Sequence, residues 1–243
     1  MSAETEKQLR RELAAAYRLV ALFGWDDHVA THLSARLPDG TFLLNPFGLL
    51  FEEITASSLI RVDMAGEVAA PSGAPLNIAG YTVHSGVLGG RPDVNCAMHL
   101  HTHDGVAVSA QKHGLLPLNQ TALLIHSDVA YHDFEGVVSR EDERERLGRD
   151  LGSRNLMILR NHGTLAVGET IADAFYRIYT LEWCCTTQVR ALAGGADLHM
   201  PGKEAVQRVG AAMNWSSPER FSLRTFWPAM LRKAERLCPG FDD

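Results

Sequence analysis

The chain has 243 residues, of which 46% are hydrophobic, and its formal net charge is −6. This length and apolar content allow one large core, and the lack of a basic patch or of an apolar run near ~18 residues argues against nucleic-acid and membrane partners. The charged residues 1–11 are unlike a signal peptide, and the four cysteines form no C-x-x-C pair, so we expect a reduced cytoplasmic protein.

Apolar side chains recur at helical or strand spacing along most of the chain. In chain order, helices are expected over residues 4–23, 77–90, 105–112, 140–151 and 171–192, with a last helix opening at Ser217-Pro218-Glu219. Strands are expected over residues 32–36, 41–45, 59–62, 94–100, 129–131 and 156–160. Tight turns between the early strands favour antiparallel pairing there and disfavour a purely parallel βαβ fold. We therefore expect one α/β domain over 1–243, with a core at about 7–196 and a helical tail over 197–243.

Residues 98–104 carry three histidines at alternating positions. In a strand, successive side chains point to opposite faces, so His99 and His101 share one face and lie close enough to bind one metal ion. A catalytic zinc typically takes three protein ligands and keeps one open position. We expect the third ligand to be His162, which stands in an Asn-His-Gly triplet. If the strand continues, His103 lies on the same face as His101.

Several further segments carry a family resemblance. The chain resembles the class II aldolase/adducin family over about residues 7–196. Its later stretches look closer to adducin head domains and their bacterial relatives than to sugar-phosphate aldolases. The matching segments are Gly80-Tyr81-Thr82-Val83-His84, Arg91-Pro92-Asp93-Val94, His99-Leu100-His101-Thr102, residues 108–117, Val129-Ala130-Tyr131-His132-Asp133 and Leu159-Arg160-Asn161-His162-Gly163.

The resemblance implies a three-layer α/β/α fold with a largely antiparallel central sheet. It also implies a homo-oligomer, often a tetramer, with active sites at subunit interfaces. In the enzymes of the family, the histidines that match His99, His101 and His162 bind a divalent metal, usually Zn2+. The other ions to consider are Mn2+, Co2+ and Fe2+.

Three departures from the family pattern count against a sugar-phosphate aldolase. The aldolases carry a catalytic glutamate four residues before the histidine that matches His84, and Gly80 stands at that position. The asparagine that helps to bind phosphate appears as His32. The other phosphate contacts are replaced by side chains that cannot donate a hydrogen bond, namely Phe47, Ile78 and Ala79.

Three neutral imidazoles leave a bound divalent metal its full charge, which makes it a strong Lewis acid. Aldol cleavage and decarboxylation both pass through an enolate that such a metal stabilises. Loss of CO2 needs no base to remove a hydroxyl proton, so the missing glutamate favours decarboxylation. We therefore expect a metal-dependent lyase that acts on a small hydroxy- or keto-carboxylate, hydroxyaryl carboxylates included.

The product carbanion still needs a proton, and His103 is the first candidate to supply it near neutral pH. Further candidates for this role are His28, His32 and Tyr131. The residues expected to line the substrate site are His28, Asn45, Gly48, Gly80 and His84.

Two other functions stay open. Three histidines without a carboxylate also suit an Fe(II) centre that activates O2. The second alternative is a non-catalytic assembly module of the adducin-head type. The chain beyond residue 196 lacks the long basic extension that a cytoskeletal adducin would need, which counts against this alternative.

Overall fold

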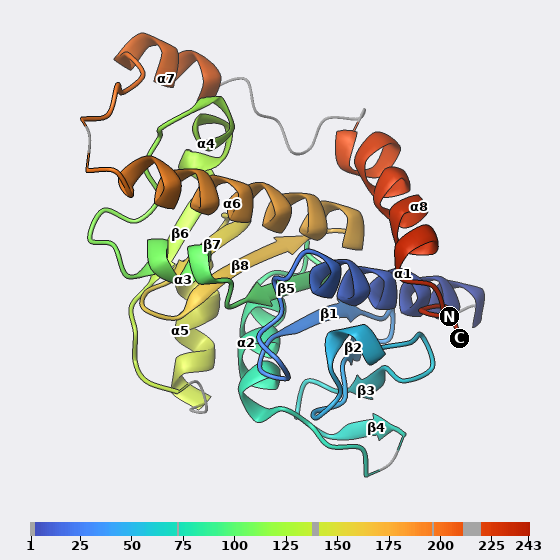
Figure 1. The fold of residues 1–243 in the computed structure, drawn as a ribbon. Helices are drawn as coiled ribbons and strands as arrows, with labels where there is room; N and C mark the ends of the chain where they lie inside the picture. Colours follow the sequence, from blue (N-terminus) through green and yellow to red (C-terminus); the bar gives the residue numbers. More distant parts are fainter. Residues whose placement is uncertain (1–2, 72, 138–140, 196, 211–219) are drawn as a thin grey trace.

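The computed structural model describes residues 3–71, 73–137, 141–195, 197–210 and 220–243, with an eight-stranded sheet at its centre (Figure 1). The strand order is β4-β3-β2-β1-β5-β8-β7-β6. Within the described chain, only β6 and β7 pair in parallel, and every other neighbouring pair is antiparallel. The strands are β1 (His32–Arg36), β2 (Phe42–Leu44), β3 (Ile60–Val62), β4 (Val68–Ala70), β5 (Cys96–Leu100), β6 (Val129–His132), β7 (Leu156–Leu159) and β8 (Gly163–Gly168).

Helices cover both faces of the sheet (Figure 1). α2 and α5 pack on one face, over a core that includes Val83 and Leu147. α1, α3, α4, α6 and α8 lie on the other face, over a core that includes Leu13 and Phe175. The arrangement confirms the three-layer α/β/α fold with a largely antiparallel sheet. The described helices are α1 (Ala3–Leu22), α2 (Ile78–Gly90), α3 (His103–Ser109), α4 (Gln120–Ile125), α5 (Glu141–Leu151), α6 (Ile171–Leu192), α7 (Lys203–Gly210) and α8 (Trp227–Leu237), with 3-10 turns at Phe51–Glu53 and His126–Asp128 and a π-helical turn at Ser222–Phe226.

The hydrophobic pattern did not predict β4, β8, α4 and α7. β8 escaped notice because it is buried at every position and so shows no alternation of polar and apolar side chains. The helix start expected at Ser217-Pro218-Glu219 lies outside the described residues. α8 begins at Trp227, whose ring packs on Phe175 with a centroid distance of 5.3 Å. None of the described helices is both long and apolar enough to span a bilayer.

The end of β5 decides the place of His103. The strand stops at Leu100, and Thr102 caps α3 because its hydroxyl accepts a hydrogen bond from the amide of Gly105. His103 is therefore the first residue of α3, and it is exposed. The strand does not continue, so the alternation that would have put His103 beside His101 does not apply.

The central strands bring distant histidines to one region. His32 on β1 stands opposite His99 on β5 in the antiparallel register. The turn between β7 and β8 carries His162. Gly163 lets this turn approach β5, because a Cβ there would meet the carbonyl oxygen of Leu100 well inside van der Waals contact.

Candidate metal centre

Three imidazoles converge where β5, the start of α3 and the β7–β8 turn meet. His99 lies on β5, His101 follows the strand, and His162 lies just before β8. The Nε2 atom of His99 is 2.9 Å from Nε2 of His101 and 3.3 Å from Nε2 of His162. Among the described residues, this is the only group of histidine, cysteine and acidic side chains arranged to hold a metal ion.

The Nδ1 atoms of two rings show where their protons lie. Nδ1 of His99 is 2.9 Å from the carbonyl oxygen of Thr164, which can only accept, so this nitrogen carries the proton. Nδ1 of His101 is 3.1 Å from the carboxylate of Asp27 and carries a proton for the same reason. In the neutral rings, both Nε2 atoms then present lone pairs to each other at 2.9 Å. This contact is repulsive by itself and becomes favourable when a cation accepts both lone pairs.

Burial keeps the rings of His99 and His162 neutral. It lowers the pKa of His99 well below the usual value, and the neighbouring His162 and His101 lower this pKa further. Burial also lowers the pKa of His162 to about 4, with a further contribution from the nearby His101. Neutral imidazole is the form that binds a metal, so the site requires little loss of protons at neutral pH.

The separation between His99 and His162 fits a tetrahedral ion such as Zn2+. Zinc binds imidazole nitrogen at ~2.0–2.1 Å, so two tetrahedral nitrogen ligands stand about 3.3 Å apart. His99 and His162 already have this separation, whereas the His99–His101 pair needs a small opening. Three protein ligands leave one further position for a substrate oxygen.

Asp27 supports His101, and no motif in the sequence marks it. It lies in the loop after α1, and its carboxylate is 3.1 Å from Nδ1 of His101 and 3.0 Å from Nε2 of His28. A carboxylate behind a metal-binding histidine fixes the ring orientation and raises the basicity of the ligand nitrogen. Asp27 and His101 are 74 positions apart, so no local pattern connects them.

A chain of buried hydrogen bonds leads from Ser34 to the metal pocket. Nε2 of His84 is 2.8 Å from Nδ1 of His32 and 3.2 Å from the His32 carbonyl oxygen, so it carries a proton and donates. Nδ1 of His84 then accepts from the Ser34 hydroxyl at 2.5 Å. His32 therefore keeps its own proton on Nε2. Burial lowers the pKa of both rings, that of His84 to about 3, so both stay neutral.

The three candidate ligands open into a cavity of about 330 Å³. Its mouth is apolar, because Phe47, Phe134 and Val137 line it and are 45%, 57% and 84% exposed. The polar lining includes His32 and Asn77, which caps α2. Of the described residues that line the cavity, none is a lysine or an arginine. Among these described residues, a phosphate group would therefore find no side-chain cation to pair with.

The other expected site residues take varied positions. His84 and Gly80 pack against His32. On β6, the hydroxyl of Tyr131 accepts a hydrogen bond from the amide of Leu115. The expected residues outside the cavity lining are His28, Asn45, Gly48, Gly80, His84, His103 and Tyr131.

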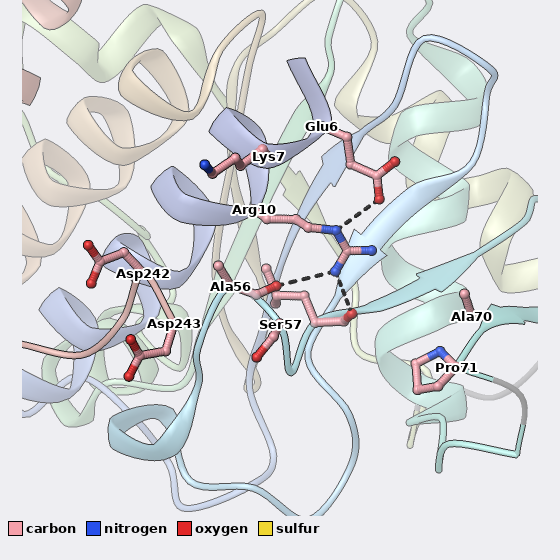
Figure 2. A pocket seen from close by; sticks show the side chains of 10 residues that line it. Glu6, Lys7, Arg10, Ala56, Ser57, Ala70, Pro71, Asp242 and Asp243 are labelled. Atoms are coloured by element: carbon pink, nitrogen blue, oxygen red, sulfur yellow. Dashed lines mark hydrogen bonds and ion pairs between the residues drawn. The ribbon is translucent and has the colours of Figure 1, made fainter. Parts of the chain in front are cut away.

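A second cavity, of about 580 Å³, lies between α1 and the last residues of the chain (Figure 2). The guanidinium of Arg10 reaches it but already donates to Glu6 and to the carbonyl oxygens of Ala56 and Leu59. No histidine or cysteine is among its described lining residues. Imidazoles are therefore a feature of the first cavity and not of the described lining of this one.

The fold and the three imidazoles define an α/β/α protein with a candidate tri-histidine metal centre. Residues 11–189 match the family described as Class II Aldolase and Adducin N-terminal domain, and the chain belongs to this family. It is 49% identical over 242 residues to a Pseudomonas aeruginosa protein whose name as an aldolase class 2 protein is provisional. That match covers 97% of this chain and 92% of the relative.

The family also contains proteins of other kinds. The chain is 46% identical to alpha-adducin of Mus musculus over 208 residues, which are 82% of this chain and 28% of the adducin. An aldolase II superfamily protein from Pseudomonas syringae has a similar structure, with a TM-score of 0.92, 43% identity and coverage of 100% and 98% of the two chains. An L-fuculose 1-phosphate aldolase from Glaciozyma antarctica PI12 has a TM-score of 0.82, 27% identity and coverage of 96% and 92%. The family that the sequence motifs indicated is thus confirmed.

Proposed function

We propose that the protein is a divalent-metal-dependent carbon–carbon lyase, with Zn2+ as the first choice of ion and Mn2+, Co2+ or Fe2+ as alternatives. The observation that carries the proposal is the convergence of three ring nitrogens, with Nε2 of His99 at 2.9 Å from Nε2 of His101 and at 3.3 Å from Nε2 of His162. The proposed substrate is a small hydroxy- or keto-carboxylate, and decarboxylation is favoured over aldol cleavage.

The surroundings of the three ligands suggest separate roles for the bound ion and for the residues around it. A bound ion supplies Lewis-acid stabilisation of the negative charge that grows on a substrate oxygen when the adjacent carbon–carbon bond breaks. Asp27 and the carbonyl oxygen of Thr164 hold His101 and His99 in the tautomer that leaves Nε2 free. With Gly80 in place of a glutamate, none of the described lining residues of the cavity is a carboxylate that could remove a hydroxyl proton, which supports loss of CO2 over retro-aldol cleavage.

We assign proton transfer in this pocket to His32, ahead of His103 and Tyr131. The His32 ring lines the cavity, and its centroid is 5.0 Å from that of His99. The hydrogen bond from His84 occupies Nδ1 of His32, so the proton on Nε2 is the one available to a substrate. His103 is exposed on α3, and the hydroxyl of Tyr131 is engaged by a backbone amide.

The cavity lining supports a substrate without a phosphate group. The described lining residues include no lysine or arginine, and Phe47, Phe134 and Val137 form an apolar mouth. Apolar surface at the mouth favours a flat, weakly polar body, as in a hydroxyaryl carboxylate. One carboxylate or carbonyl oxygen is enough to reach the open metal position.

Metal analysis of the purified protein tests the first part of the proposal. We expect about one Zn2+ per chain after exposure to the ion, and we expect His101→Ala to lose both the ion and lyase activity. His126→Ala is the matched control, because His126 is an exposed histidine on a 3-10 turn outside the cavity lining. Full activity in a metal-free His101→Ala sample would refute the mechanism.

A substrate panel tests the second part. Hydroxyaryl carboxylates and small keto acids are compared with L-fuculose 1-phosphate, and the products are scored as CO2 or as an aldehyde fragment. We expect metal-dependent CO2 release from a carboxylate. Cleavage of the sugar phosphate with no CO2 from any acid would overturn the preference for decarboxylation.

Two alternatives keep specific support. Three imidazoles with no carboxylate in the ligand group also suit Fe(II) and O2 chemistry, which oxygen uptake by the iron-loaded protein would reveal. The 46% identity to alpha-adducin supports a non-catalytic assembly module, which a wild-type protein unable to bind metal would favour.

We also propose that the chain forms a homo-oligomer, of the tetramer type, with sites at subunit interfaces. Sedimentation equilibrium tests this proposal.

A further inference from the structure

Glu182 is a buried carboxylate that the proposed chemistry does not use. It lies on α6 and is 1% exposed. One of its oxygens accepts a hydrogen bond from the hydroxyl of Thr102, and the other accepts one from the hydroxyl of Thr164. A single side chain therefore connects two segments that lie far apart in the chain.

Both threonines adjoin the candidate metal ligands. Thr102 follows His101 directly and caps α3. Thr164 follows His162 closely on β8, and its carbonyl oxygen accepts from Nδ1 of His99 at 2.9 Å. The Glu182 carboxylate thus ties together the segments that carry all three imidazoles.

The packing around this bridge is close. A Cβ built on Gly105 would stand 2.7 Å from Oγ1 of Thr102 and 3.2 Å from Oε1 of Glu182. Asp104 adds a second link between α3 and α6, since its carboxylate accepts from the Thr186 hydroxyl at 2.5 Å. A leucine at position 182 would fill a similar volume without the cost of burying a carboxyl group, so the carboxyl must serve more than packing.

We propose that Glu182 is a positioning residue for the metal centre. By holding Thr102 and Thr164, it sets the place of His101 relative to His99 and His162. The inference rests on the proposed function in one respect, namely that the three histidines bind a divalent ion. It assigns Glu182 no contact with the ion or the substrate.

The test compares metal binding by the wild-type chain and by Glu182→Leu. Zn2+ and Co2+ affinities are measured by competition with a chromophoric chelator, and the visible spectrum of the Co2+ form reports the coordination geometry. We expect Glu182→Leu to bind both ions about 10- to 100-fold more weakly, with an altered Co2+ spectrum. Glu182→Gln keeps one accepting oxygen, so it should lose less metal affinity than Glu182→Leu. Thr180→Val is the matched control, because it removes a buried α6 hydroxyl that bonds only within the helix.

A second pair of variants covers the case in which Glu182→Leu does not fold. Thr164→Val removes one hydroxyl at nearly constant size and should weaken metal binding, whereas Thr164→Ser keeps the hydroxyl and should retain it. If folded Glu182→Leu, or Thr164→Val, binds metal with wild-type affinity and shows an unchanged Co2+ spectrum, the inference about Glu182 is wrong. The proposed function is not affected by that result. A wild-type protein that binds neither ion overturns the proposed function and this inference with it.

Discussion

The imidazole of His32 occupies the space into which a side chain at Gly80 would project. A Cβ built on Gly80 would stand 2.7 Å from Cδ2 and 3.2 Å from Nε2 of His32. The two positions are therefore coupled, because the ring at 32 can take its place only while position 80 has no side chain. The loss of a side chain at 80 and the gain of an imidazole at 32 form one structural feature of this pocket.

This coupling predicts a non-additive pair of substitutions. We expect Gly80→Ala to lower the free energy of unfolding by about 1–3 kcal/mol in the wild-type background, because the new methyl group overpacks the site. In a His32→Ala background the same change should be neutral or stabilising by up to about 1 kcal/mol, since alanine favours a helix. Urea unfolding of the four proteins gives the interaction energy.

Gly89→Ala provides the control for that cycle. Gly89 also lies on α2, but a Cβ there would approach only the flexible end of Met64, at 3.3 Å. We expect Gly89→Ala to change the free energy of unfolding only slightly, and by the same amount whether position 32 is histidine or alanine. If Gly80→Ala lowers the free energy of unfolding equally in the wild-type and His32→Ala backgrounds, the two positions are not coupled.

Asp27 should matter for metal affinity more than for folding. Its carboxylate is 37% exposed and holds Nδ1 of His101. We expect Asp27→Ala to weaken Zn2+ binding at least about 10-fold, because the ligand ring loses its orienting partner. Isothermal titration calorimetry measures this, and His28→Ala, which removes the other partner of Asp27, is the control. An Asp27→Ala protein with the affinity of the wild type would mean that His101 needs no such support.

Metal binding should stabilise the fold. An ion that binds only the folded state at about 1,000 times its Kd raises the free energy of unfolding by about 4 kcal/mol. We therefore expect a clear rise in the melting temperature of the wild type when Zn2+ replaces a chelator, and little rise for His162→Ala. Differential scanning fluorimetry of both proteins checks this. The same Zn2+ shift in both proteins would place the ion elsewhere.

The sequence could predict the ligand set because its signals are local. His99 and His101 are two positions apart, and the Asn-His-Gly triplet around His162 belongs to a family motif. The supporting contacts could not be predicted, because Asp27 meets His101 and Glu182 meets Thr102 only through tertiary packing, over separations of 74 and 80 positions.

Secondary structure shows the same limit. Alternation places His99 and His101 well but does not mark where β5 stops, and the cap at Thr102 ends the strand before His103. The buried β8 carries no alternation at all, so its existence follows only from its pairing with β5 and β7.

The buried carboxyl of Glu182 should leave a signature in the pH dependence of stability. Burial raises its pKa to about 7, although hydrogen bonds from Thr102 and Thr164 oppose the rise. The folded protein therefore holds this proton more tightly than the unfolded chain. As the pH rises from about 4.5 to about 7, this group alone lowers the free energy of unfolding, and above that range its effect is constant.

Other buried groups act in the opposite direction, so a single pH profile would not isolate Glu182. The pKa values of His99 and His162 are lowered, so these rings remove stability as the pH falls below about 6.5. The difference between the wild type and Glu182→Gln cancels their contribution. Between pH 4.5 and 7, we expect the free energy of unfolding of Glu182→Gln to rise by about 3 kcal/mol relative to that of the wild type. Urea unfolding of the metal-free proteins measures this difference. A difference that stays flat over this range would mean that Glu182 does not ionise there.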